Sequence, residues 1–323
     1  MPGDKADVVM FGPKPIIEEA LTKAGFPLHK AWAAPDQDAF IAAIAPKVRA
    51  IAAVAGHGPV DGALMARFPK LEIVSSFGVG YDHIDAKWAG AHGVVVTNTP
   101  DVLNEEVADT ALGLLLATVR HLPQAERYLR AGNWPEHGDY QLTPSLRDRT
   151  VGIVGMGRIG KAIARRLDAM KVPVVYHSRR AADVPYRHYP SILDMARDVN
   201  LMIVITPGGA ATRNLINAEV LGALGPQGIL INMARGSVVD EPALIKALQD
   251  KTILSAGLDV CANEPAVPQA LIGMENVVLL PHVGSASHAT RRAMDELVGN
   301  NIVSWFSGKG ALTPVPETPV KKT

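Results

Sequence analysis

The chain has 323 residues, of which 48% are hydrophobic and 20% are charged, a composition typical of globular proteins. This length exceeds the size at which one hydrophobic core stops growing, so we expect two domains. Lys plus Arg number 32, as do Asp plus Glu, and this balance argues against a nucleic-acid-binding surface or a polybasic membrane patch.

The cysteine content and the N-terminus bear on location. Cys261 is the single cysteine and cannot form an internal disulfide, which favours a reducing compartment. No signal-type apolar segment follows the first residues, and no apolar run reaches the roughly 18 residues that a membrane span needs. We therefore expect a cytoplasmic protein that does not cross a membrane.

Short β-branched runs alternate with segments of helical period, which predicts parallel α/β architecture. Before residue 100, strands are predicted at Asp7–Phe11, Arg49–Val54, Glu72–Ser75 and Val94–Thr97. Helices are predicted between them near Pro15–Ala24, Asp36–Ala45 and Gly62–Phe68. A long apolar helix then covers about Val102–Arg120, between Pro100 and Pro123.

The alternation restarts after this helix. Further strands are predicted at Val151–Val154, Val174–Tyr176, Met202–Ile205, Ile229–Asn232, Ser255–Val260 and Val277–Leu280, enough for a complete doubly wound dinucleotide fold. No strand follows the helical segment His288–Phe306, so its apolar face should pack back on the first domain and make that domain discontinuous. The tail Thr313–Thr323 is rich in Pro and Lys, and we expect it to be poorly ordered.

The strongest local motif is a GxGxxG sequence between a predicted strand and a predicted helix. Gly155 would permit the tight turn, Gly157 would let the backbone approach a pyrophosphate, and Gly160 would let the helix pack on the strand. The N–H groups and dipole at the start of the helix favour phosphate there. A glycine-rich turn without a ligand is the alternative, and the strand–turn–helix context argues against it.

The end of the next strand indicates which nicotinamide cofactor fits. NAD sites usually place an acid there for the ribose 2′-OH, whereas here Ser178, Arg179 and Arg180 follow the strand and the nearest acid is Asp183. A serine hydroxyl and guanidinium groups would donate to a 2′-phosphate. This predicts NADP(H) in preference to NAD(H), with a solvated basic turn as the alternative.

The motifs and their order resemble the D-isomer-specific 2-hydroxyacid dehydrogenases, of the glyoxylate/hydroxypyruvate reductase type, over nearly the whole chain. The matching segments are 77–85 (FGVGYDHID), 104–110 (NEEVADT), the glycine motif, 232–236 (NMARG), 258–265 (LDVCANEP) and 281–285 (PHVGS). The resemblance implies two doubly wound parallel-sheet domains, with a Rossmann cofactor domain, 99–288, inserted into a flavodoxin-like substrate domain made of 1–98 and 289–323.

The resemblance also implies that Arg235, Glu264 and His282 are catalytic, and no metal is expected. His282 would be the general acid that protonates the carbonyl oxygen of a 2-keto acid, because imidazole titrates nearest to working pH. Glu264 would orient the ring and favour imidazolium. Arg235 would bind the substrate carboxylate and the developing oxyanion. Each residue alone has a structural alternative in a loop, a turn or a strand end.

The same resemblance implies the remaining site residues. Those that would contact the cofactor are Gly155, Met156, Gly157, Arg158, Ile159, Gly160, Ser178, Arg179, Arg180, Thr110, Thr206, Met233, Ala234 and Asp259. Those that would contact the substrate are Val79 and Gly80 through their amides, Arg235, His282, Gly284 and Ser285. For Thr110 and Asp259, local capping or loop bonding is an equal alternative.

Family members form homodimers through the cofactor domain, and Trp134 matches a residue that some place near the partner's substrate. A plain interface or core role for Trp134 is as well supported. Cys261 stands where the family often has an aromatic residue, and a buried packing role is expected for it. The role of His57 stays open.

These observations together predict an NADPH-dependent reductase of small 2-keto acids, with glyoxylate and hydroxypyruvate as substrates. The small residues at 55–58 would also allow a bulkier hydroxyphenylpyruvate-like acid. A non-catalytic dinucleotide-sensing corepressor is the alternative from another class, since one fold can serve several functions. The set of Arg235, Glu264 and His282 favours the enzyme.

Overall fold

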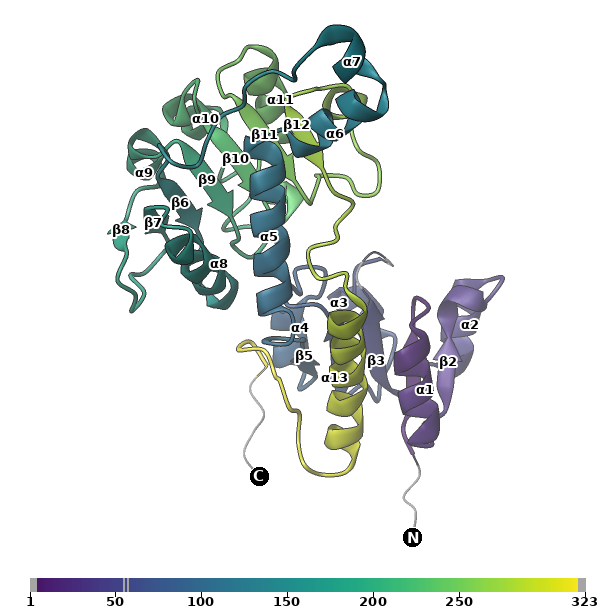
Figure 1. Ribbon diagram of the computed structural model, residues 1–323. Coiled ribbons are helices and arrows are strands. Elements are labelled where there is room, and N and C mark those ends of the chain that lie inside the picture. The colour runs from purple at the N-terminus through teal and green to yellow at the C-terminus, as the bar shows by residue number, and fades with distance from the viewer. Residues whose placement is uncertain (1–4, 55, 57, 319–323) are drawn as a thin grey trace. The chain divides into compact units, whose positions relative to one another are not determined.

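The computed structural model describes residues 5–54, 56 and 58–318, and the chain divides into two compact units (Figure 1). The first unit combines Met1–Leu103 with Ser287–Thr323, and the second is Asn104–Ala286. These boundaries lie a few residues from those expected from the sequence. In the described part of the chain, no helix is both long and apolar enough to span a membrane.

The first unit is built on a parallel 5-stranded sheet in the order β2-β1-β3-β4-β5. Its strands are β1 (Asp7–Met10), β2 (Leu28–Lys30), β3 (Val48–Val54), β4 (Ile73–Phe77) and β5 (Val95–Thr97). Its helices are α1 (Pro15–Lys23), α2 (Gln37–Ile44), α3 (Gly62–Ala66), α4 (Ala86–Ala91) and α13 (His288–Phe306), with a 3-10 turn η1 (Ala31–Ala33). This strand order is that of flavodoxin-like sheets.

The second unit contains a parallel 7-stranded sheet in the order β12-β11-β10-β9-β6-β7-β8. Its strands are β6 (Val151–Val154), β7 (Val174–His177), β8 (Arg187–Tyr189), β9 (Leu201–Val204), β10 (Ile229–Asn232), β11 (Ser255–Leu258) and β12 (Val277–Leu279). This is the Rossmann order with one strand added, and the order reverses between β6 and β9, where such sheets bind their ligands.

The second unit also contains eight α-helices, and helices lie on both faces of its sheet. They are α5 (Asn104–Val119), α6 (Leu122–Arg130), α7 (Asn133–His137), α8 (Arg158–Ala169), α9 (Ile192–Asp198), α10 (Ala218–Leu224), α11 (Glu241–Gln249) and α12 (Gln269–Ile272), with a 3-10 turn η2 (Gly236–Val238). On one face α5 packs against α8 and strands β10–β12. On the other, α9, α10 and α11 bury Met195, Leu221 and Leu248 in one apolar core.

The terminal helix α13 lies in the first unit. It begins at Ser287, whose side chain accepts a hydrogen bond from the Thr290 amide, which is a standard N-cap. The helix packs against α1 and β4, and its residues Met294, Val298 and Ile302 are buried.

Two expectations about elements were incomplete. The edge strands β2 and β8 were not predicted, because Leu28-His29-Lys30 and Arg187-His188-Tyr189 lack the apolar runs of the central strands. No ranges were predicted for the short helices α4, α6, α7 and α9–α12. The tail was expected to be poorly ordered, which is wrong for residues 313–318. Val315 is buried and its amide bonds to the Val96 carbonyl of β5. Residues 319–323 lie outside the described part.

Candidate active site

The glycine motif forms the turn between β6 and α8, at the point where the strand order of the second sheet reverses. Gly155 has a φ of +107°, and a Cβ there would lie 3.0 Å from the Ile205 carbonyl oxygen, so this turn favours glycine. A Cβ on Gly160 would lie 2.1 Å from the Gly155 carbonyl oxygen, so α8 can pack this closely only with glycine. At Gly157, a Cβ would meet no atom within 4 Å.

This turn has the features that a dinucleotide phosphate requires. Helix α8 has 12 residues, and its N-cap Gly157 makes no side-chain capping bond, so the first N–H groups of the helix can donate to an anion. Met156 is buried beneath the turn, while Arg158 and Ile159 begin the helix. The residues present therefore fit a bound pyrophosphate.

The end of β7 presents the predicted cationic group. Arg179 and Arg180 are exposed, and in the described part of the chain neither guanidinium forms a salt bridge or a hydrogen bond. The Ser178 hydroxyl donates to the Arg180 carbonyl oxygen at 2.6 Å, which closes the turn. Two uncommitted guanidinium groups at a strand end suit a phosphate better than a ribose hydroxyl.

Three loops bring the predicted catalytic residues together at the carboxyl edge of the second sheet. Arg235 follows β10, Glu264 follows β11, and His282 follows β12. Parallel strands end at the same edge, which explains why residues far apart in sequence meet there. His282 Nδ1 lies 2.7 Å from Glu264 Oε2, and the second oxygen of Glu264 accepts from the Cys261 amide at 3.0 Å.

The charge state of Glu264 follows from its neighbours. Burial is the largest single influence and raises its pKa, but the His282 hydrogen bond and charge, the Cys261 amide and the charge of Arg235 oppose it. Together these interactions hold the pKa of Glu264 below its ordinary value. The carboxylate is therefore ionised at neutral pH and can hold the imidazole ring by a charge-assisted bond.

Asp259 fixes the loop that carries His282. Its two carboxylate oxygens accept from the amides of Val283 at 2.7 Å and Gly284 at 2.9 Å, and its carbonyl oxygen accepts from the His282 amide. Burial raises the pKa of Asp259 above its ordinary value, although the two amide bonds offset part of this effect. His282 itself has a φ of +54°, a left-handed conformation that is uncommon outside glycine and that these bonds stabilise.

Several predicted cofactor residues make local contacts in the structure. Thr110 Oγ1 donates to the Gly284 carbonyl oxygen at 3.2 Å, so Thr110 and Asp259 show the loop bonding that was the alternative for both. The Met233 amide bonds to the Val204 carbonyl, and the Ala234 amide bonds to Asn232 Oδ1. A cofactor contact through the backbone of Met233 or Ala234 would therefore use a carbonyl oxygen.

The other predicted residues lie as follows. Thr206 follows β9 and its amide lies beside Gly155, and Ser285 follows Gly284 in the His282 loop. Val79 and Gly80 belong to the first unit, in the loop after β4. Trp134 is exposed on α7 and its Nε1 donates to Asp139. His57 lies outside the described residues.

Sequence reasoning missed three residues that support this site. Asn232 is buried and its side chain bridges the Ala234 amide and the Arg235 carbonyl. A Cβ on Gly236 would lie 2.0 Å from the Cys261 carbonyl, and Glu241 accepts from the Ala262 amide. Asn232 and Gly236 both lie in the matched segment 232–236, which was the available signal, whereas no such signal pointed to Glu241.

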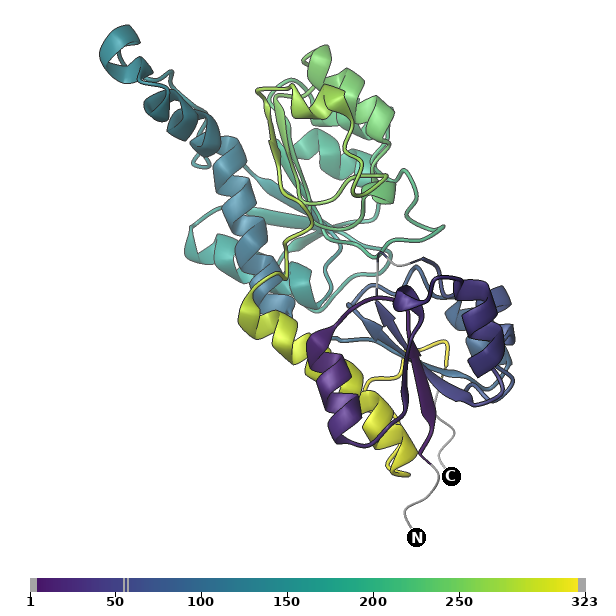
Figure 2. The same cartoon turned by 90° about the vertical axis from the view of Figure 1, so that its right-hand side faces the viewer.

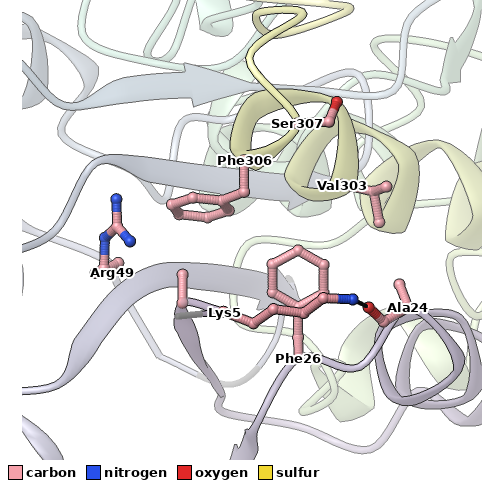
Figure 3. A pocket seen from close by; sticks show the side chains of 8 residues that line it. Lys5, Ala24, Phe26, Arg49, Val303, Phe306 and Ser307 are labelled. Atoms are coloured by element: carbon pink, nitrogen blue, oxygen red, sulfur yellow. Dashed lines mark hydrogen bonds between the residues drawn. The ribbon is translucent and has the colours of Figure 1, made fainter. Parts of the chain in front are cut away.

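A cavity of about 350 Å³ lies elsewhere, at the amino-terminal edge of the first sheet. Figure 3 shows Phe26 and Phe306 in its wall with Lys5 and Arg49. Lys5 donates to the carbonyl oxygen of Ala24 at the end of α1, and Arg49 pairs with Glu72. Both cations thus have structural partners, and ligands of doubly wound sheets bind at the opposite edge.

The glycine turn lies where the strand order reverses, and Arg235, Glu264 and His282 lie at the same edge of that sheet. This arrangement defines a dinucleotide-dependent dehydrogenase of the two-unit α/β class. The profile of the D-isomer specific 2-hydroxyacid dehydrogenase NAD-binding domain matches residues 112–284. The chain belongs to the D-isomer specific 2-hydroxyacid dehydrogenase family.

Similar proteins support this membership along the whole chain. The chain is 46% identical to glyoxylate/hydroxypyruvate reductase A of Arabidopsis thaliana over 93% of this chain and 95% of that one. It is 45% identical to hydroxyphenylpyruvate reductase of Plectranthus scutellarioides over the same shares. The crystal structure of an NADPH-dependent glyoxylate/hydroxypyruvate reductase from Sinorhizobium meliloti, in complex with NADP and malonate, matches with a TM-score of 0.91 and 50% identity over 98% of each chain.

Proposed function

We propose that the protein is an NADPH-dependent reductase of small 2-keto acids, with glyoxylate and hydroxypyruvate as its substrates. The contact between His282 Nδ1 and Glu264 Oε2 carries this proposal, because it holds an imidazole at the sheet edge where ligands of this fold bind. The reductases from Arabidopsis and Sinorhizobium support the substrate class.

The proposed chemistry divides among the three catalytic residues. Bound NADPH supplies the hydride that goes to the keto carbon. His282 donates the proton from Nε2 to the carbonyl oxygen, while its Nδ1 is held by ionised Glu264. The Arg235 carbonyl accepts from the Asn232 side chain, and the next residue, Gly236, packs against the Cys261 backbone. Arg235 binds the substrate carboxylate and stabilises negative charge that develops on the oxygen.

The proposal also covers binding. Arg179 and Arg180 bind the 2′-phosphate of NADPH, while Ser178, whose hydroxyl donates to the Arg180 carbonyl, closes the turn that carries them. The amides of Val79 and Gly80 bind the carboxylate of the keto acid. Thr110, Asp259 and Gly284 act mainly by holding the His282 loop. A larger substrate is the second candidate, because a relative of 45% identity is a hydroxyphenylpyruvate reductase.

A homodimer and a cytoplasmic location are parts of the same proposal. Figure 2 shows α6 and α7 extending beyond the end of α5. The large apolar residues Leu122, Leu129 and Trp134 on these helices are each more than half exposed, as expected for a surface that a second copy covers. The single, buried cysteine suits a reducing compartment.

Steady-state oxidation of NADPH tests the function. We expect turnover with glyoxylate or hydroxypyruvate, and the same assay with hydroxyphenylpyruvate ranks the second candidate. His282→Ala should lower kcat by about 100- to 10,000-fold, the range for loss of a general acid, while NADPH affinity stays near that of the wild type. Cofactor binding without turnover on any of the three acids would instead favour a dinucleotide sensor.

A further inference from the structure

The segment Thr313–Thr318, here called the C-terminal strap, lies along the free edge of β5 (Figure 1, yellow). Pro314 forms an antiparallel bridge with Thr97, and Thr318 Oγ1 accepts from the Val96 amide at 2.9 Å. These contacts protect a sheet edge that would otherwise expose unpaired backbone groups. Protection of this edge, however, does not explain why the strap also contacts a neighbouring loop.

The strap makes two further connections to the loop Gly78–Tyr81, which holds the proposed carboxylate-binding amides. In the first, Thr313 Oγ1 donates to the Asn98 carbonyl at 2.6 Å, and Asn98 Nδ2 donates to the Val79 carbonyl at 2.8 Å. In the second, the Tyr81 hydroxyl donates to Glu317 Oε2 at 3.0 Å. Burial and then the bond to Glu317 raise the pKa of Tyr81 to about 12, so the hydroxyl keeps its proton.

A buried asparagine on α13 holds the strap in place. Asn301 is 0% exposed, and its Oδ1 accepts from the amides of Leu312 at 2.9 Å and Thr313 at 3.1 Å. Its Nδ2 donates to Thr313 Oγ1 at 2.9 Å. The strap is therefore fixed to a long packed helix, and its contacts can transmit that rigidity to the loop.

The contacts leave the loop amides available. Gly78 exchanges two hydrogen bonds with Thr99, and Val79 uses its carbonyl oxygen for Asn98. In the part of the chain that the structure describes, no hydrogen bond uses the amide of Val79 or Gly80. The loop is thus held by the Gly78 amide, by the carbonyl groups of Gly78 and Val79 and by the Tyr81 side chain, while the adjacent amides of Val79 and Gly80 are uncommitted.

We propose that Tyr81, Glu317 and Asn98 are positioning residues through which the C-terminal strap fixes the Val79 and Gly80 amides for the carboxylate of the 2-keto acid. This inference rests on the proposed function. Preorganised donors bind a carboxylate more tightly because their ordering cost is met before the ligand arrives. Loosening the strap should therefore weaken keto-acid binding more than it slows the chemical step.

Tyr81→Phe and Glu317→Gln test the second connection. Each should raise KM for hydroxypyruvate about three- to tenfold, the loss expected for one hydrogen bond of ordinary strength. The NADPH dissociation constant, kcat and Tm should stay near wild-type values. The double variant should be no worse than the more severe single variant, because Tyr81→Phe removes the donor and Glu317→Gln weakens the acceptor of the same contact.

Asn98→Ala tests the first connection, and its effect on KM should multiply with that of Tyr81→Phe, because the two contacts are separate. Glu296→Gln is the matched control. This exposed glutamate on α13 makes no hydrogen bond or ion pair among the described residues, and its removal should leave KM unchanged. Unchanged KM in Tyr81→Phe, Glu317→Gln and Asn98→Ala, with turnover intact, would overturn the positioning role.

Calorimetry with oxamate separates this inference from the proposed function. Oxamate carries the carboxylate and carbonyl of a keto acid but is not reduced, so its affinity reports on the loop without turnover. If the wild type reduces no keto acid, the proposed function fails. Weaker oxamate binding in Tyr81→Phe would still support the strap, whereas equal affinities in wild type and variant would reject it.

Discussion

Glu264 uses both of its carboxylate oxygens inside the site. One accepts from the Cys261 amide and the other from His282 Nδ1, so the side chain joins the loop after β11 to the loop after β12. Because its pKa lies below the ordinary value despite burial, the ionised form is the one that the folded state favours. The orientation of the His282 imidazole therefore depends on the negative charge of Glu264.

Glu264→Gln should lower kcat about 100-fold, since a neutral amide orients and stabilises the imidazolium less well. The stabilising contribution of the ionised carboxylate is present above its unfolded pKa, near 4.5, and is lost as pH falls through the lower folded value. Urea midpoints at pH 7 should therefore favour the wild type, and the difference should shrink towards pH 3. A difference independent of pH would contradict this assignment.

The proposed choice of NADPH over NADH rests on two arginine side chains. Arg179→Ala with Arg180→Ala should weaken NADPH binding about ten- to 100-fold, because charge-assisted bonds to the 2′-phosphate are lost. NADH lacks that phosphate and should bind with nearly unchanged affinity. Fluorescence titration with both cofactors measures the two losses. Arg197→Ala removes an exposed arginine that pairs with Asp194 and serves as the control; equal losses for both cofactors would refute the phosphate contact.

At the scale of elements, the site depends on close packing between the turns that follow β10 and β11. A Cβ at Gly236 would lie 2.0 Å from both the carbonyl carbon and the oxygen of Cys261, which is backbone and cannot rotate away. Arg235 precedes this glycine and Glu264 follows the Cys261 turn. If the two turns separated, the Arg235 guanidinium would therefore move away from the Glu264 carboxylate.

Gly236→Ala should destabilise the protein by about 1–3 kcal/mol, the usual cost of overpacking, and should lower kcat/KM as well. Thermal unfolding and steady-state kinetics measure the two effects. Gly222→Ala in α10 is the matched control, because its added Cβ would meet no atom within 4 Å and alanine suits a helix better than glycine by about 1 kcal/mol. Equal unfolding temperatures and equal kcat/KM in the two variants would show that the two turns can separate without loss of stability or activity.

Prediction of the elements from sequence succeeded where burial is complete. Strands such as β3 and β10 are buried almost throughout, so their apolar runs identify them. The edge strand β8 has the sequence Arg-His-Tyr and only Tyr189 is buried, so no apolar pattern marks it. The strap was misjudged because its order comes from tertiary contacts that its own sequence does not encode: the side chain of Asn301 on α13 and the backbone of Val96 on β5, which is far away in sequence.

At the scale of the whole molecule, α6 and α7 carry the surface proposed for dimerisation. Leu129 is 54% exposed and Trp134 is 57% exposed, and desolvation of such side chains stabilises an interface. Leu129→Glu should place a charge in the interface and shift the protein from dimer to monomer. Sedimentation velocity measures the change.

Leu312→Glu provides the comparison, since Leu312 is 53% exposed but belongs to the first unit. It should leave the sedimentation coefficient unchanged. A wild-type protein that sediments as a monomer at micromolar concentration would reject the dimer, and dissociation by both variants would reject the assignment to these helices.

The amino-acid sequence by itself determined the parallel α/β architecture, the glycine turn and the return of the terminal helix, because each depends on a periodicity or on the steric properties of glycine. It also identified Arg235, Glu264 and His282 as the catalytic candidates through their motifs. Only the tertiary structure decided how Asp259, Gly236 and Asn232 support them and how the strap meets the loop after β4. The contacts of Asp259 and Gly236 join loops that follow different strands, and they arise only when parallel strands place their ends side by side. The strap reaches its loop only because it lies along β5 in the folded chain.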